Sequence, residues 1–373
     1  MRESINKRIG TVILIIVVAL LNVMIVIQPA VALSAARWGL SLWFNSVLPG
    51  ILPFLIGVNV LMAFGAVKHL GVLLSFAMKR LFRLPGSAGF ALVMGTLSGY
   101  PVGAKIVCQM RAKGDLSRSQ AQRLLGFSNN AGPLFILGAV GAGMFASPAF
   151  GYLLLAGHYA GALGLGLLLR LFAKNKENHG ILPQPAPNEA ANTRLQPIGK
   201  ILGSSVKNAM ETMLIIGGFI VLFSVISALI SHLPFIGSQL ATPIAGAIEM
   251  TGGLGTLSEG ILTRAGAVFA AAILGFGGLS ILFQALSFID KTDLSPALYI
   301  LCKMVHAALA ALVTFLLYPL FAQRIESQIA QTTFATTPTA TQTLVSSASI
   351  FGISLVVILA ICAVIIFKAS KKN

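Results

Sequence analysis

Four apolar segments of the chain are interrupted by residue types that bind small polar solutes or expose the backbone. Leu92–Val107 carries SGYPVG at its middle, and Leu124–Ala139 carries SNNAGP. Thr242–Gly260 contains Glu249 next to Thr-Gly-Gly, and Ala272–Leu286 contains GFGGLS. A helix interrupted at membrane depth exposes amides and carbonyls that lipid cannot satisfy, so such breaks persist only where they line protein or a watery cavity. Corresponding breaks in two halves of a chain indicate the substrate site of a transporter.

The first half supplies most of the candidate ligands. Glycines in SGYPVG allow close backbone approach, and a helix that starts there presents free amides to an anion. Lys105, one turn on, would strengthen that attraction; the alternative is a tight turn packed against protein, with Lys105 snorkelling to the interface. The adjacent amides of Asn129 and Asn130 suit a planar polar ligand, with interhelical hydrogen bonding as the alternative. The predicted substrate-binding residues are Ser98, Gly99, Tyr100, Gly103, Lys105, Ser128, Asn129, Asn130, Ser280 and Gln284.

Two glutamates in apolar segments are candidates for coupling transport to a proton or a sodium ion, because ionisable groups are costly in a membrane. Glu249 lies beside the backbone that its break frees, where capping of the adjacent helix is the alternative role. An anionic solute would be repelled by a bare Glu249 carboxylate, so a proton or cation site suits this residue better. Glu211 lies one turn after Lys207, and an ion pair between the two would also explain it.

The other ionisable and sulfur-containing residues show no catalytic pattern. His158 and His306 lie in predicted spans, where a lone histidine is more often an interhelical hydrogen-bonding group. Lys303, close to His306 in the sequence, fits no role in this pattern. No cysteine or histidine cluster has metal-ligand spacing, and the aspartates lie in predicted loops. We therefore expect no enzyme activity, no metal and no cofactor.

The composition is that of a multi-pass membrane protein. The chain is 56% hydrophobic and only 10% charged, whereas soluble proteins carry about 25% charged residues. Its net charge of +16 comes from basic residues that flank apolar runs, which is how orientation in a bacterial cell membrane is set. We expect a small-molecule solute, membrane lipid and a coupling proton or sodium ion as partners. The sequence does not decide whether the protein forms a homo-oligomer. We expect no nucleic-acid partner, because no nucleic-acid-binding motif is present.

The order of these segments predicts an all-α polytopic membrane protein with two related halves, re-entrant hairpins and broken transmembrane helices. Residues 1–172 form the first half, with an uncleaved first span at Thr11–Gln28, and residues 201–321 form the second. The polar stretch 173–200 is a predicted cytoplasmic linker, and 322–373 a Thr-rich loop with a last span.

Basic flanks place both termini in the cytoplasm, with about eight crossings. The segment from Lys68 to Pro85 fits either an interfacial amphipathic helix or a span with basic flanks.

Three blocks of the first half resemble the YlbJ family of sporulation integral membrane proteins: LPGILPFLIGVNVLMAFG, FRLPGSAGFALVMGTLSGYPVGAKIV and LLGFSNNAGPLFILGAVGAG. That family contains a nucleoside-recognition Gate domain, and its order of hairpins and broken helices is similar to that of concentrative nucleoside transporters. The resemblance implies a solute transporter of spore-forming bacteria, located in the outer forespore membrane. The implied solute is dipicolinic acid, a planar aromatic dicarboxylate passed from mother cell toward forespore.

The sequence therefore predicts an integral membrane transporter of a small polar or anionic solute, with the solute itself given only by the resemblance. The alternative is a non-transporting membrane scaffold or regulator of spore assembly. A dry, fully packed centre between the broken segments would be the signature of that alternative.

Overall fold

The computed structural model describes residues 2–64, 66–173, 197–233, 238–260 and 262–333. Helices make up this part of the chain, and no strand occurs in it. The last predicted span, most of the predicted linker and much of the Thr-rich tract lie outside the described residues. The predicted all-α class is confirmed.

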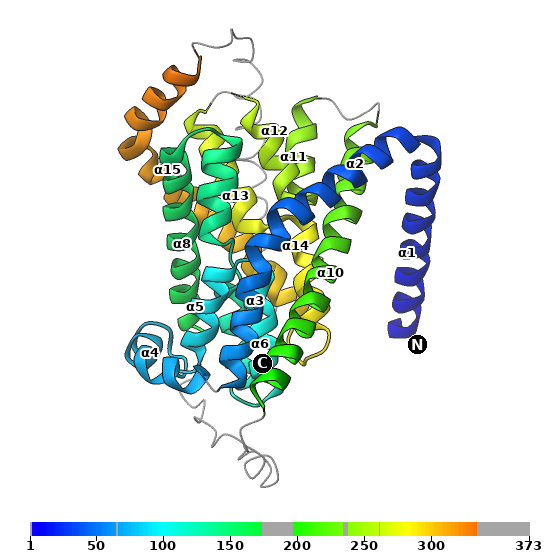
Figure 1. Cartoon of the computed structure of the whole chain (residues 1–373). Helices are drawn as coiled ribbons and strands as arrows, with labels where there is room; N and C mark the ends of the chain where they lie inside the picture. The colour runs from blue at the N-terminus through cyan, green and yellow to red at the C-terminus, as the bar shows by residue number, and fades with distance from the viewer. Residues whose placement is uncertain (1, 65, 174–196, 234–237, 261, 334–373) are drawn as a thin grey trace.

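The N-terminal helices form an arm that leads into the bundle (Figure 1). They are α1 (Arg2–Ile27), α2 (Pro29–Leu42), the π-helical turn η1 (Trp43–Val47) and α3 (Leu48–Ala63). The chain turns by 104° between α1 and α2, where Pro29 lacks the amide that would continue the helix. The indole Nε1 of Trp43 donates to the carbonyl of Met213 at 3.0 Å, which fixes η1 on the second half.

The first half continues with an amphipathic helix, a hairpin, a broken helix and a span. These are α4 (Ala66–Phe82), α5 (Ala88–Ser98), α6 (Val102–Ala112), α7 (Arg118–Ser128), η2 (Phe135–Met144) and α8 (Pro148–Arg170). The predicted break of Leu92–Val107 is confirmed, because α5 ends at Ser98 and α6 begins at Val102. In Figure 1, α4 lies across one end of the bundle, which favours the interfacial interpretation.

The second half repeats the order span, hairpin, broken helix, span. Its helices are α10 (Ile198–Ser231), α11 (Ser238–Ile248), α12 (Met250–Ser258), α13 (Arg264–Phe276), α14 (Gly278–Ile289) and α15 (Pro296–Thr333). The predicted break of Thr242–Gly260 is confirmed at Glu249. Figure 1 shows the α5–α6 hairpin in the lower part of the bundle and the α11–α12 hairpin in the upper part, so the two halves are inverted.

Several helices are long and apolar enough to cross a membrane. They are Pro148–Arg170, Ile198–Ser231, Arg264–Ile289 and Pro296–Ser327, and the bent pair of α1 and α2 passes the same test together. The predicted total of about eight crossings stays a prediction, since α3 and η2 are shorter and the last span is outside the described residues. Two bounds differ from expectation: α10 begins at Ile198, inside the predicted linker, and α15 runs on to Thr333, past the predicted span end at Phe321.

Helix α8 ends and helix α10 begins at one end of the bundle, which we call the linker end (Figure 1). The connections from α6 to α7 and from α14 to α15 lie at the same end. Basic residues on or next to these elements, and on α4 across the same end, are Lys79, Arg80, Arg111, Lys113, Arg118, Arg170, Lys200, Lys207 and Lys291. Such an excess is typical of the cytoplasmic side, and the orientation stays a prediction.

Small residues bring α8 and α15 into close contact at the centre. A Cβ on Gly161 would lie 2.7 Å from the amide nitrogen of Ala310, and one on Gly157 would overlap the Thr314 hydroxyl. Such small residues let membrane helices approach closely. This contact places His158 of α8 against His306 of α15, with ring centroids 4.6 Å apart.

Candidate functional site

In the first half, the tip of the hairpin packs directly on the break of the following helix. Gly99 has a φ of +82°, and a Cβ there would lie 2.8 Å from the amide nitrogen of Gly132. A Cβ on Gly103 would overlap the carbonyl oxygen of Ser128. Only glycine fits at these two positions, so the predicted tip and the predicted SNNAGP break form one unit, which we call the first tip–break pair.

The second half repeats this arrangement between Glu249 and the Gly277-Gly278 break, which we call the second tip–break pair. Gly278 has a φ of +76°, and a Cβ there would lie 3.1 Å from the amide nitrogen of Met250. The buried Glu249 carboxylate accepts hydrogen bonds from the amides of Thr251 at 3.0 Å and Gly252 at 2.6 Å. This is the capping geometry, and the coupling role of Glu249 stays a prediction.

One side chain of the first pair reaches the second half. The hydroxyl of Tyr100 donates to the carbonyl of Leu274 at 3.0 Å, shortly before the second break. Helix α14, which follows that break, also packs against α6. The first tip–break pair therefore contacts the second half close to its break, and the convergence of both pairs on one cavity stays a prediction.

Asn129 closes the first break through three hydrogen bonds. Its Oδ1 accepts from the amide of Ala104 at 3.3 Å, and its Nδ2 donates to the hydroxyl of Tyr299 at 2.7 Å. Its backbone carbonyl accepts from Lys303 Nζ at 3.3 Å. The amide side chain thus connects the hairpin, the broken helix and α15.

The amine of Lys303 lies at the centre of the bundle with no exposed surface. Its Nζ donates to the Tyr100 hydroxyl at 2.7 Å and to His306 Nδ1 at 3.2 Å, and it lies 4.6 Å from the centroid of the Tyr100 ring. All these partners are uncharged acceptors or π faces, and no carboxylate among the described residues pairs with it. A buried charge is costly unless it is paired.

The two histidines extend this network, and their contacts fix their tautomers. His306 Nε2 lies 2.9 Å from the carbonyl of His158, which only accepts, so Nε2 carries the proton and Nδ1 accepts from Lys303. His158 Nε2 accepts from the amide of Ala131 at 3.0 Å. In the neutral ring the proton is then on His158 Nδ1.

Several buried polar atoms around the first pair lack a partner among the described residues. They are Ser98 Oγ, Ser128 Oγ, Asn130 Oδ1 and His158 Nδ1. Buried polar atoms are nearly always hydrogen-bonded, so unpaired ones indicate water, an ion or a ligand. Of these residues, Ser128 and Asn130 flank Asn129, whose carbonyl accepts from Lys303, and His158 lies against His306, a further partner of Lys303.

Other predicted residues lie elsewhere. Lys105 turns away from the tip and donates to Thr212 Oγ1 at 2.6 Å and to the Asn208 carbonyl at 3.4 Å, both on α10. The buried Gln284 donates to Ser280 Oγ at 3.2 Å within α14.

Glu211 is exposed on α10, and the described residues include no ion pair between it and Lys207.

The sequence patterns missed Lys303, Tyr299 and the two histidines as members of one cluster. The sequence did contain one signal for this cluster: a lysine within the apolar run of α15, followed one turn later by a histidine. In the described part of the chain, no group of three His, Cys, Asp or Glu is placed to hold a metal ion.

Comparison with known proteins agrees with these features. The family model of the Gate domain, described as nucleoside recognition, matches residues 44–147, which include the first tip–break pair. The sporulation integral membrane protein YlbJ of Bacillus subtilis (strain 168) is 34% identical over 347 residues, which cover 84% of this chain and 85% of that protein. No solved structure matches. The chain therefore belongs to the YlbJ family of sporulation integral membrane proteins.

Proposed function

We propose that the protein transports a small organic anion, and that this anion is the planar dicarboxylate dipicolinic acid, moved across the outer forespore membrane during spore formation. The main evidence for an anionic solute is Lys303, whose amine is fully buried and has no carboxylate partner among the described residues. The solute and the membrane come from the resemblance and from the word sporulation in the relative's name.

Electrostatics favours an anion over a neutral nucleoside at this centre. Taking an ammonium out of water costs several kcal/mol unless an opposite charge compensates it. A solute carboxylate beside Lys303 would supply that charge, whereas a neutral solute would leave the cation uncompensated. The ring of Tyr100 and the unpaired atoms of Ser128 and Asn130 offer a flat face and hydrogen-bonding groups for an aromatic carboxylate.

The inverted halves supply a means of alternating access. In inverted-repeat transporters, one repeat rocks against the other around a fixed site near the midplane. Here Tyr100 crosses between the halves, and Lys303 and Asn129 have no exposed surface, so the centre is closed to both sides. Opening requires the first tip–break pair to part from α15 or from α13. Coupling to a proton or sodium ion through Glu249 or Glu211 remains part of the proposal.

The close packing of the centre favours a second candidate, a membrane scaffold or regulator that transports nothing. In that case Lys303 would serve only to hold the hairpin, the break and α15 together. The unpaired polar atoms of the first pair count against it, since a purely structural centre gains nothing from them.

Uptake by lipid vesicles that contain the purified protein separates the two candidates. We expect saturable uptake of dipicolinate and related planar carboxylates, and little uptake of uncharged nucleosides. Saturable uptake of nucleosides alone would contradict the proposal that the solute is an anion. No uptake of any solute by correctly folded protein would favour the scaffold function.

A further inference from the structure

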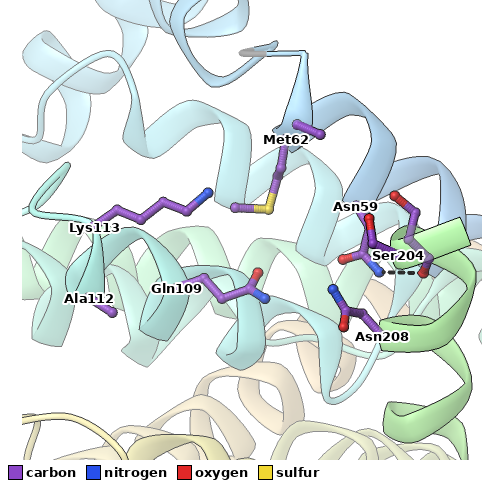
Figure 2. Close-up of a pocket in the computed structure, with 9 residues that line it drawn as sticks. Asn59, Met62, Gln109, Ala112, Lys113, Ser204 and Asn208 are labelled. Atoms are coloured by element: carbon purple, nitrogen blue, oxygen red, sulfur yellow. Dashed lines mark hydrogen bonds between the residues drawn. The ribbon is translucent and has the colours of Figure 1, made fainter. Parts of the chain in front are cut away.

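A polar recess lies at the linker end, and Lys303 does not line it. It has a volume of about 310 Å³ and lies between α3, α6 and the first turns of α10 (Figure 2). It is lined by Asn59, Met62, Ala63, Gln109, Ala112, Lys113, Ser204, Ser205 and Asn208. The volume is within the range of small-molecule sites, which begins at about 300 Å³.

Three side chains in this recess end in polar groups that make no hydrogen bond or ion pair within the described structure. Figure 2 shows the amides of Gln109 and Asn208 directed toward one another across the gap, with the amine of Lys113 reaching in from the far side. Asn59, in contrast, donates to the carbonyl of Ser205 at 3.1 Å and holds α3 against α10. One wall is therefore fixed, and the facing groups are available to a ligand.

The charge of the recess is positive. Its lining contains one lysine and neither aspartate nor glutamate. Lys105 and Gln109 lie at i and i+4 on α6, and Lys113, the C-cap residue, continues the same face at i+8. The amine of Lys105 donates to the backbone carbonyl of Asn208, so this cation lies against a residue that lines the recess.

We propose that this recess is a subsite where the carboxylate solute binds at the linker end before or after it occupies the centre. Lys113 attracts the carboxylate, and the amides of Gln109 and Asn208 bind its oxygens. The proposal rests on the transport function proposed above, but it assigns that solute a second, separate place of binding.

Protection from thiol labelling tests this subsite without relying on transport. Ala63 lines the recess without contributing a polar side chain, and the native Cys108 and Cys302 are buried. In an Ala63→Cys, Cys362→Ser protein in neutral phosphatidylcholine nanodiscs, dipicolinate should slow maleimide labelling about tenfold at ten times its dissociation constant. The matched control Lys79→Cys, on the exposed face of α4, should be labelled at the same rate with and without dipicolinate.

Variants then separate the recess from the centre. Gln109→Leu and Asn208→Leu should abolish protection of Ala63→Cys, and Lys113→Gln should weaken binding about two- to fivefold, as loss of a solvated charge pair does. Lys303→Met should lose transport and keep protection.

No protection of Ala63→Cys in a protein that transports dipicolinate would overturn the subsite. Protection that survives Gln109→Leu and Asn208→Leu would overturn it as well. Protection without transport would leave the subsite standing and instead contradict the proposed transport.

Discussion

The two tip–break pairs are built alike but are completed by different chemistry. In the second pair, the Glu249 carboxylate accepts from two amides at the start of α12, and the backbone of Gly278 packs closely against Met250. The polar groups of this pair are therefore satisfied by nearby residues. In the first pair, residues from α8 and α15 take part, and polar atoms of Ser98, Ser128 and Asn130 still lack partners among the described residues. This difference is what the proposed function needs, with solute binding at the first pair and a supporting role for the second.

The largest structural effect is expected at Gly103, where the first tip touches its break. Gly103→Ala places a Cβ on the carbonyl oxygen of Ser128, and such overpacking costs about 1–3 kcal/mol or more. Gly218→Ala is the control, because nothing lies within 4 Å of its added Cβ. Thermal melting of the purified proteins in one detergent measures both, and equal melting temperatures would disprove the tight contact.

Asn129 and Asn130 are neighbours with different expected effects. Asn129→Ala leaves the Tyr299 hydroxyl and the Ala104 amide without a partner, so it should lower stability by about 1–3 kcal/mol. Asn130→Ala removes one local bond to Phe127 and an unpaired oxygen, so it should reduce uptake while folded yield stays near normal. Normal uptake in folded Asn130→Ala would remove that side chain from the solute site.

Glu249→Gln tests whether the second pair is only supportive. Weakening a helix cap costs about 0.5–2 kcal/mol, so melting should occur at lower temperature while uptake per folded molecule persists. The dependence of uptake on pH and on sodium should match that of the wild type if Glu249 only caps its helix. An altered dependence would instead support the predicted coupling role of Glu249.

The smallest effect is expected at the exposed ion pair of Arg111 and Asp293, which joins α6 to the α14–α15 connection with N–O distances of 2.9 and 2.8 Å. The Arg111 guanidinium lowers the pKa of the Asp293 carboxyl. A lowered pKa stabilises the fold above the ordinary carboxyl pKa of about 4 and loses that contribution as pH falls through the lowered value.

Asp293→Asn should therefore cost less than about 1 kcal/mol, equally between about pH 5 and 8. The difference from wild type should fade only in stronger acid. Melting curves across this range measure it, and a difference that grew toward low pH would contradict the sign.

The sequence predicted the breaks well because glycine, proline and asparagine interrupt helices locally. It placed Tyr100 and Asn129 in the site for the same reason. It did not place Lys303 there, because the contact between Lys303 and Tyr100 joins positions 203 residues apart. It assigned Lys105 to the solute, whereas the phase of α6 turns that side chain to Thr212 on α10. A carboxylate before Thr-Gly-Gly predicts a cap and an ion site equally, and only the geometry showed the cap at Glu249.

Lys303→Met, assayed for both dipicolinate uptake and thermal stability, tests whether the buried amine of Lys303 binds the solute. Methionine matches the length of the lysine stem and removes a buried charge that has no carboxylate partner in the described structure. The substitution also leaves the Asn129 carbonyl and His306 Nδ1 without their donor, and each buried group left unpaired costs about 1–3 kcal/mol. We predict that uptake falls to the background of empty vesicles, while the protein still folds and melts at a lower temperature than wild type. Wild-type uptake by the folded variant would contradict it.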